Sequence, residues 1–64
     1  MDDRLMRYVP KSKIDAIRDI YHDSDGYWVC LNKGWNTGYE DCHTIHTDTI
    51  TELRQELRWI EKGD

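Results

Sequence analysis

The clearest hydrophobic pattern in the chain lies near its C-terminal end. Apolar side chains recur there at the spacing of one helix face, at positions i, i+3, i+7 and i+10: Ile50, Leu53, Leu57 and Ile60. Thr49 before this stripe and Glu52 three residues later fit a capping box, in which each side chain binds a free N–H group of the first turn. Asp48 is the alternative cap, and Gly63 is expected to end the helix. The pattern predicts an amphipathic helix that starts at about Thr49.

A hairpin is predicted in the middle of the chain. Tyr27–Leu31 is a run of aromatic and β-branched residues, which is typical of a strand. Asp23–Gly26 has strong turn chemistry, because Asp binds nearby backbone groups and Gly adopts positive φ. The run before it, Lys13–His22, fits either a helix or a strand, since periodicity cannot decide over so short a segment. Because a turn and a strand follow directly, we interpret it as the first strand of a hairpin.

The remaining segments give weaker signals. Arg4–Val9 has weak strand character and meets Pro10, which a strand tolerates only at its edge or end. Residues 32–38 form a polar connection, and residues 39–41 are expected to be loop. Cys42–His46 has the short alternation of a last strand. The predicted fold class is therefore α+β, with a small antiparallel sheet of about four strands followed by one C-terminal helix.

The length of 64 residues allows a single domain. Residues 1–5 are expected to be a leader or extension, with Met6 as the natural start, so the domain should span residues 6–64. A core of this size supplies only roughly 3–5 kcal/mol, and added support usually comes from disulfides, a metal or a partner subunit. With only two cysteines in the chain, a homo-oligomer is the expected support.

The helix offers a candidate subunit contact. Trp59 lies off the apolar stripe, so the helix carries one more large apolar side chain than its own sheet needs. We therefore expect the helix to cover its own sheet and also to pack against a partner. The candidate interface residues are Leu53, Leu57, Trp59 and Ile60.

The expected cellular compartment is based on two signals that we do not find in the sequence, a signal peptide and a membrane span. The N-terminus is charged and lacks the apolar stretch of a signal peptide. No apolar run approaches the ~20 residues of a membrane span. The expected location is the cytoplasm, without membrane association and with reduced cysteines.

The net charge of −4 argues against binding to nucleic acid by bulk attraction, although a local basic face remains open. Aromatic residues interleaved with basic ones suggest such a face, on which bases stack and cations contact the phosphates. The candidate residues are Lys11, Lys13, Arg18 and Tyr21, with Tyr8, Trp28, Lys33 and Trp35 as further members. The alternative is that these aromatics form the core of a protein that has no Phe.

Two cysteines and two histidines have the side-chain chemistry of a zinc site: Cys30, Cys42, His43 and His46. Their spacing argues against zinc, because no Cys-x-x-Cys pair is present and residues three apart on a strand point to opposite faces. A cysteine nucleophile assisted by His43 fails for the same reason, since neighbours on a strand face apart. We expect no zinc, and we interpret both cysteines as small buried hydrophobic residues.

The acidic residues between positions 15 and 25 are a third candidate. Asp23 and Asp25 are explained by the turn, whereas Asp15 and Asp19 would share one face of a strand. Carboxylates can hold a divalent cation such as Mg²⁺, which polarises a phosphodiester and readies a water molecule for attack. Solvent-exposed strand positions are the simpler interpretation of Asp15 and Asp19.

Several short segments between Met6 and Ile60 resemble a family of very small phage-derived inhibitors of type II-A CRISPR immunity. The matching segments are Asp19-Ile20-Tyr21, Gly26-Tyr27-Trp28, Gly34-Trp35 and His43-Thr44-Ile45-His46. This family is similar in fold to the transcriptional coactivator positive cofactor four. The resemblance implies four antiparallel strands and one helix, assembly into dimers or dimers of dimers, and nicking of supercoiled DNA in a bacterial host.

The resemblance also implies a residue for the chemistry. Asp19 matches the family's catalytic aspartate best, with Asp15 as a rival, and Asp19 would also ligate Mg²⁺ or another divalent cation. The expected activity is that of a divalent-metal-dependent DNA nickase, acting on DNA without needing to bind the CRISPR nuclease. Two alternatives stay open: an acidic DNA mimic or protein-binding inhibitor of a host nuclease, and a non-catalytic module for single-stranded DNA.

Overall fold

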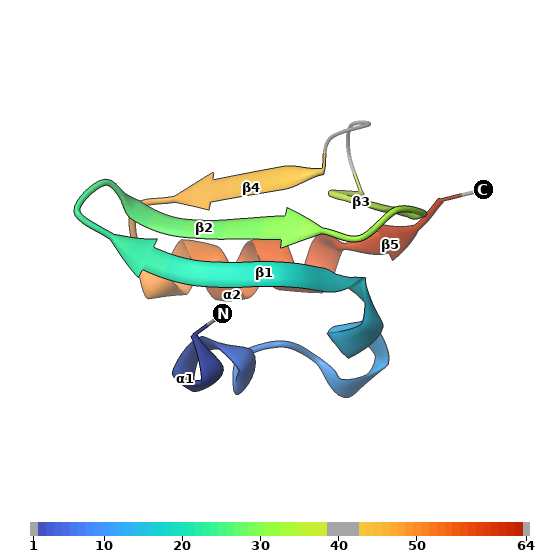
Figure 1. Cartoon of the computed structure of the whole chain (residues 1–64), viewed down its shortest axis with the longest axis horizontal. Coiled ribbons are helices and arrows are strands. Elements are labelled where there is room, and N and C mark those ends of the chain that lie inside the picture. Colours follow the sequence, from blue (N-terminus) through green and yellow to red (C-terminus); the bar gives the residue numbers. More distant parts are fainter. Residues whose placement is uncertain (1, 39–42, 64) are drawn as a thin grey trace.

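The computed structural model describes residues 2–38 and 43–63, which form two small antiparallel sheets and three helical segments (Figure 1). The main sheet has the strand order β1-β2-β4, and the second sheet pairs β3 with β5. The helical segments are α1 (Asp3–Met6), the 3₁₀ helix η1 (Lys11–Ala16) and α2 (Ile50–Trp59). The strands are β1 (Ile17–Asp23), β2 (Gly26–Leu31), β3 (Trp35–Asn36), β4 (Thr44–Thr47) and β5 (Glu61–Lys62).

The predicted hairpin is present. Strands β1 and β2 pair antiparallel up to Asp23 and Gly26, and the Asp23 side chain accepts a hydrogen bond from the Asp25 N–H at 2.9 Å. Gly26 adopts a φ of 125°, and a Cβ atom there would lie 2.4 Å from the carbonyl oxygen of Thr47 on β4. The glycine therefore serves both the turn and the close approach of β4.

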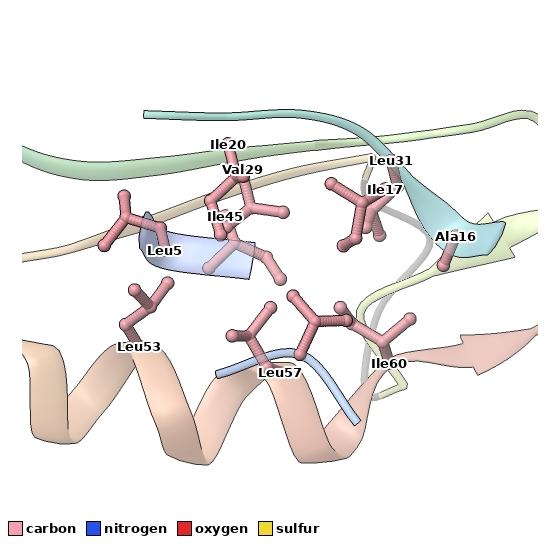
Figure 2. Close-up of a cluster of buried hydrophobic side chains, with 11 residues drawn as sticks. Leu5, Ala16, Ile17, Ile20, Val29, Leu31, Ile45, Leu53, Leu57 and Ile60 are labelled. Atoms are coloured by element: carbon pink, nitrogen blue, oxygen red, sulfur yellow. The ribbon is translucent and has the colours of Figure 1, made fainter. Parts of the chain in front are cut away.

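Helix α2 covers one face of the main sheet (Figure 1). Figure 2 shows apolar side chains from the strands pointing toward those of the helix. Ile20 and Val29 on the strands are completely buried, as are Leu53 and Leu57 on the helix. Alternation along the strands sends every second side chain to the opposite face, which none of the described helices covers (Figure 1). The predicted α+β fold is confirmed, with a three-stranded main sheet and a second small sheet in place of one sheet of about four strands.

The N-terminal segment differs from the prediction. Arg4–Val9 contains no strand, and Asp2 instead caps the short helix α1 by accepting a hydrogen bond from the Arg4 N–H at 3.0 Å. The Asp2 N–H donates to the carbonyl of Ile20 on β1 at 2.8 Å, and Leu5 is buried in the core. Residues 2–5, which we expected to lie outside the domain, therefore pack onto it.

The segment Lys13–His22 is only partly a strand. Residues up to Ala16 form the 3₁₀ helix η1, and β1 starts at Ile17 with a bulge before Asp19. Asn32 holds this helix by donating its backbone N–H to the Ala16 carbonyl at 2.8 Å and its side chain to the Asp15 carbonyl at 2.9 Å. The expectation that Asp15 and Asp19 share a strand face was wrong, because these long-range bonds outweigh the local pattern.

The polar connection at residues 32–38 contains the short strand β3, which pairs with β5. Helix α2 therefore ends at Trp59, not at Gly63, because the chain turns to extended geometry at Ile60 and joins the second sheet. Gly38 lies against this exit, with a φ of 90°, and a Cβ atom there would lie 1.9 Å from the Trp59 carbonyl oxygen. The strand expected at Cys42–His46 begins at Thr44, and Cys42 and the expected loop at residues 39–41 lie outside the described residues.

The start of α2 is as predicted. The Thr49 hydroxyl oxygen accepts a hydrogen bond from the Glu52 N–H at 3.1 Å, and the hydroxyl donates to the Glu52 carboxylate at 3.2 Å. Within residues 2–38 and 43–63, no helix is long and apolar enough to cross a membrane.

Removal of this cap should destabilise the fold measurably. Thr49→Ala is expected to lower the free energy of unfolding by about 1 kcal/mol, because the Glu52 N–H loses its partner. Urea denaturation followed by circular dichroism measures this. Thr51→Ala, an exposed change inside the same helix, is the matched control and should leave the stability unchanged or slightly raised. Equal losses in both variants would show that the cap contributes nothing.

Candidate functional site on the open face of the sheet

The face of the main sheet away from α2 carries two rows of side chains that run across the strands. Register places Asp19 opposite Cys30 and Cys30 opposite Thr44, which forms the first row. Two residues further along, Tyr21, Trp28 and His46 form a second row. Because both rows belong to neighbouring positions of one face, Asp19 lies next to a line of aromatic rings.

The second row, called here the ring row (Tyr21, Trp28 and His46), is stacked. The ring centroids of Trp28 and His46 lie 4.1 Å apart with an interplanar angle of 19°, and those of Tyr21 and Trp28 lie 6.5 Å apart at 17°. Tyr21 and His46 are exposed, and Trp28 between them is half-buried. The outward faces of the two end rings are therefore where further flat groups can stack.

The hairpin turn holds the ring row in place. The indole Nε1–H of Trp28 donates to the Asp23 carboxylate at 3.1 Å. The Nε2 atom of His46 lies 2.8 Å from the Asp25 carbonyl oxygen, within hydrogen-bonding distance. Asp23 and Asp25 thus hold the rings of Trp28 and His46 in position, so the ring row is already ordered before a ligand binds.

The surroundings of Tyr21 raise the pKa of its phenol. Desolvation of the phenol raises its pKa above the ordinary value of about 10, and the nearby charges of Cys30, Asp23 and Asp19 raise the pKa further. Neutral Tyr21 therefore contributes stability that is present below the ordinary pKa and is lost as the pH rises through the raised pKa.

Asp23→Asn is expected to lower the pKa of Tyr21 toward its ordinary value, because one of the neighbouring negative charges is removed. Ultraviolet absorbance of the phenolate during an alkaline titration measures this, with Tyr21→Phe assigning the transition. Asp25→Asn is the control, since Asp25 is not among the groups that raise this pKa. An unchanged Tyr21 transition in Asp23→Asn would contradict the assigned interaction.

A basic hollow adjoins the first row on the side away from the ring row. It is lined by Arg18, Leu31, Lys33, His43 and Thr44, and Thr44 also belongs to the row of Asp19. The backbone of this region is fixed by the Leu31 N–H, which donates to the His43 carbonyl at 2.8 Å. The Nδ1 atom of His43 lies 2.8 Å from the Trp35 carbonyl oxygen. This basic hollow therefore brings together two basic side chains and one imidazole, and Arg18 in its lining directly precedes Asp19 in the chain.

The structure separates the predicted nucleic-acid residues. Arg18 and Tyr21 lie on either side of Asp19 at the site. Lys11 and Lys13 lie instead on η1, where the Lys13 ammonium donates to the Arg58 carbonyl oxygen on the side of α2. His46 is a ring-row member that the sequence interpretation missed, because its place beside Trp28 depends on the pairing of β4 with β2.

The predicted subunit interface is largely internal. Leu53, Leu57 and Ile60 are completely buried against the sheet of their own chain (Figure 2). These three side chains therefore cannot contact a partner subunit, because they already pack into the core of their own chain. Trp59 is the exception, with 62% of its surface exposed.

Among the described residues of this face, one carboxylate, that of Asp19, lies between the basic hollow and the ring row. Within the part of the chain that the structure describes, no three His, Cys, Asp or Glu side chains are grouped closely enough to hold a metal ion. The described residues therefore do not by themselves form a binding site for a divalent cation. Comparisons of this chain with protein-family models, curated proteins and solved structures gave no match.

Proposed function

We propose that this protein acts on DNA through the open face of its main sheet and nicks supercoiled DNA, with Asp19 at the scissile phosphate. The observation that carries the proposal is the order along this face, where Asp19 lies between the basic hollow and the ring row. In this proposal the protein is a phage inhibitor of type II-A CRISPR immunity in the cytoplasm of a bacterial host.

The two flanking features suit unpaired DNA. Stacking on an aromatic side chain contributes about 1–3 kcal/mol per base, and it requires bases that have left the duplex. Negative supercoiling favours such opened segments. The ring row offers the stacking surface, and Arg18 with Lys33 offers cations to the backbone. A strand lying along this face would carry its phosphates past Asp19.

The proposed chemistry is hydrolysis of one phosphodiester. The Asp19 carboxylate takes a proton from a water molecule as the water oxygen bonds to phosphorus. The bond from phosphorus to one ester oxygen breaks, and that oxygen receives the proton from the Asp19 carboxyl. The products are one hydroxyl end and one phosphate end, and Asp19 is restored. The Mg²⁺ and the dimeric or larger assembly expected from the family resemblance remain parts of this proposal.

Nicking would weaken an RNA-guided nuclease without contact between the two proteins. Exchange of a DNA duplex for an RNA–DNA hybrid is nearly balanced in free energy and is tipped by negative supercoiling. One nick releases the torsion of a whole plasmid, so strand opening by the nuclease becomes less favourable.

The direct test incubates supercoiled plasmid with the pure protein, separately with Mg²⁺, with Mn²⁺ and with a chelator. Open circles that accumulate with time support the proposal, and their sensitivity to the chelator shows whether a cation takes part. Plasmid that stays supercoiled under every condition contradicts the nicking activity.

The acidic character of the chain favours a second candidate, a protein-binding inhibitor that mimics DNA. The net charge is −4, and Asp19, Asp23 and Asp25 lie on one strand and its turn. Such carboxylates can occupy a nuclease surface that normally binds phosphates. Stable co-elution of the two purified proteins, lost in Asp23→Asn/Asp25→Asn and weakened by salt, would favour this candidate over nicking.

A further inference from the structure

The solvent-facing side of α2 is divided by charge. Thr51, Arg54, Gln55 and Arg58 line one continuous surface hollow, called here the basic stripe. Their spacing of three and four residues places them on a single face of the helix. The acidic residues Glu52 and Glu56 belong to the neighbouring face. Trp59 lies beside the stripe and forms a second hollow with Gln55 and Arg58.

The cations of the basic stripe are available to a ligand. Among residues 2–38 and 43–63, neither guanidinium group is in an ion pair, and that of Arg54 lies over the Tyr8 ring at 5.6 Å from its centroid. The Lys13 ammonium joins the same surface through its hydrogen bond to the Arg58 carbonyl. Three positive charges thus gather on one surface of a chain whose net charge is −4.

We propose that the basic stripe binds the phosphate backbone of duplex DNA. From Thr51 to Arg58 the stripe is about 10 Å long at the helical rise of ~1.5 Å per residue. A duplex carries roughly one negative charge per 1.7 Å of axis, so it offers this stripe several phosphates at once. The hydroxyl of Thr51 and the amide of Gln55 add neutral donors of the kind that contact phosphates.

The basic stripe is separate from the site around Asp19, because α2 and the open face lie on opposite sides of the main sheet (Figure 1). The two surfaces therefore contact different stretches of DNA. Binding of duplex DNA by the basic stripe requires no nicking. A test of this binding therefore does not depend on the activity proposed for Asp19.

The test measures binding of a fluorescent duplex by anisotropy over a range of salt concentrations. Arg54→Gln/Arg58→Gln removes two phosphate contacts. It is expected to reduce the slope of log affinity against log salt by about 1.8 and to weaken binding on the order of fiftyfold at 0.1 M salt. Arg4→Gln/Arg7→Gln makes the same charge change at exposed positions of the α1 segment and is the matched control, expected to change little.

Three results would overturn the proposal. The first is no measurable duplex binding by the unmodified protein, and the second is equal weakening by both double variants, which indicates net charge alone. The third is stripe-dependent binding of polyglutamate without binding of the duplex, which assigns the surface to an acidic protein. If circular dichroism shows that Arg54→Gln/Arg58→Gln is unfolded, the single variant Arg58→Gln takes its place in the same measurement. Its expected change in the slope of log affinity against log salt is about 0.9.

Discussion

Asp19→Asn is expected to abolish the conversion of supercoiled plasmid to open circles. The substitution keeps the size and shape of the side chain but removes the carboxylate that accepts the proton of the attacking water. A positioned general base contributes about 10²–10⁴-fold to a rate, so the loss should be at least of this size. Agarose gels of a time course measure the remaining rate against that of the unmodified protein.

Asp15→Asn is the matched control for this prediction. It removes the same charge four residues away, but Asp15 is exposed on η1 and does not share the face of Asp19. Its nicking rate should therefore equal that of the unmodified protein. Equal loss in both variants would show that the change in net charge, and not the position of Asp19, lowers the nicking rate. Full activity in Asp19→Asn would remove Asp19 from the proposed chemistry.

Leu57→Ala is expected to have the largest effect on stability. The Leu57 side chain is completely buried between α2 and the main sheet, and removal of such a side chain costs about 2–5 kcal/mol. A core of this size supplies roughly 3–5 kcal/mol in total, so a large fraction of the variant should be unfolded at room temperature. Urea denaturation followed by circular dichroism measures the loss.

Trp59→Ala provides the comparison on the same helix, because Trp59 is 62% exposed and should lose much less stability. The two variants also separate the core role of Leu57 from the interface role predicted for it. A core residue destabilises by the same amount at every protein concentration, whereas an interface residue makes the midpoint depend on concentration. A loss in Leu57→Ala that disappears on dilution would contradict its placement in the core.

The parts of the fold with short-range causes were predicted correctly. The capping box at Thr49, the buried pair Leu53 and Leu57 of α2 and the turn before Gly26 each depend on residues within a few positions of one another. The strand β2 is rich in β-branched and aromatic residues and pairs on both sides, so propensity and burial agree.

The errors arose where distant residues determine the local structure. The 3₁₀ helix η1 is held by Asn32, sixteen positions after Ala16, and β3 exists only because β5 pairs with it. The end of α2 likewise depends on Gly38, whose missing Cβ lets the chain approach the Trp59 carbonyl. Short segments of this kind have no periodicity that a single sequence can show.

The sequence also identified only some residues of the candidate site. Asp19, Tyr21 and Arg18 were identified from one segment of the sequence, and the structure places them together. Membership of His46 and Lys33 depends on which strands pair and on where β2 ends, so the sequence alone did not join them to Asp19. The strand bulge before Asp19 also separates Asp15 from the site.

The central claim is that DNA binds the open face of the main sheet around Asp19. Its most direct test is a nuclear magnetic resonance titration of ¹⁵N-labelled Asp19→Asn protein, which should not cut, with a short unpaired oligonucleotide. The account predicts that the signals of Asn at position 19, the Tyr21 amide and the Trp28 indole N–H shift together and saturate. Unchanged signals at these three positions, with shifts elsewhere or none at all, would contradict it.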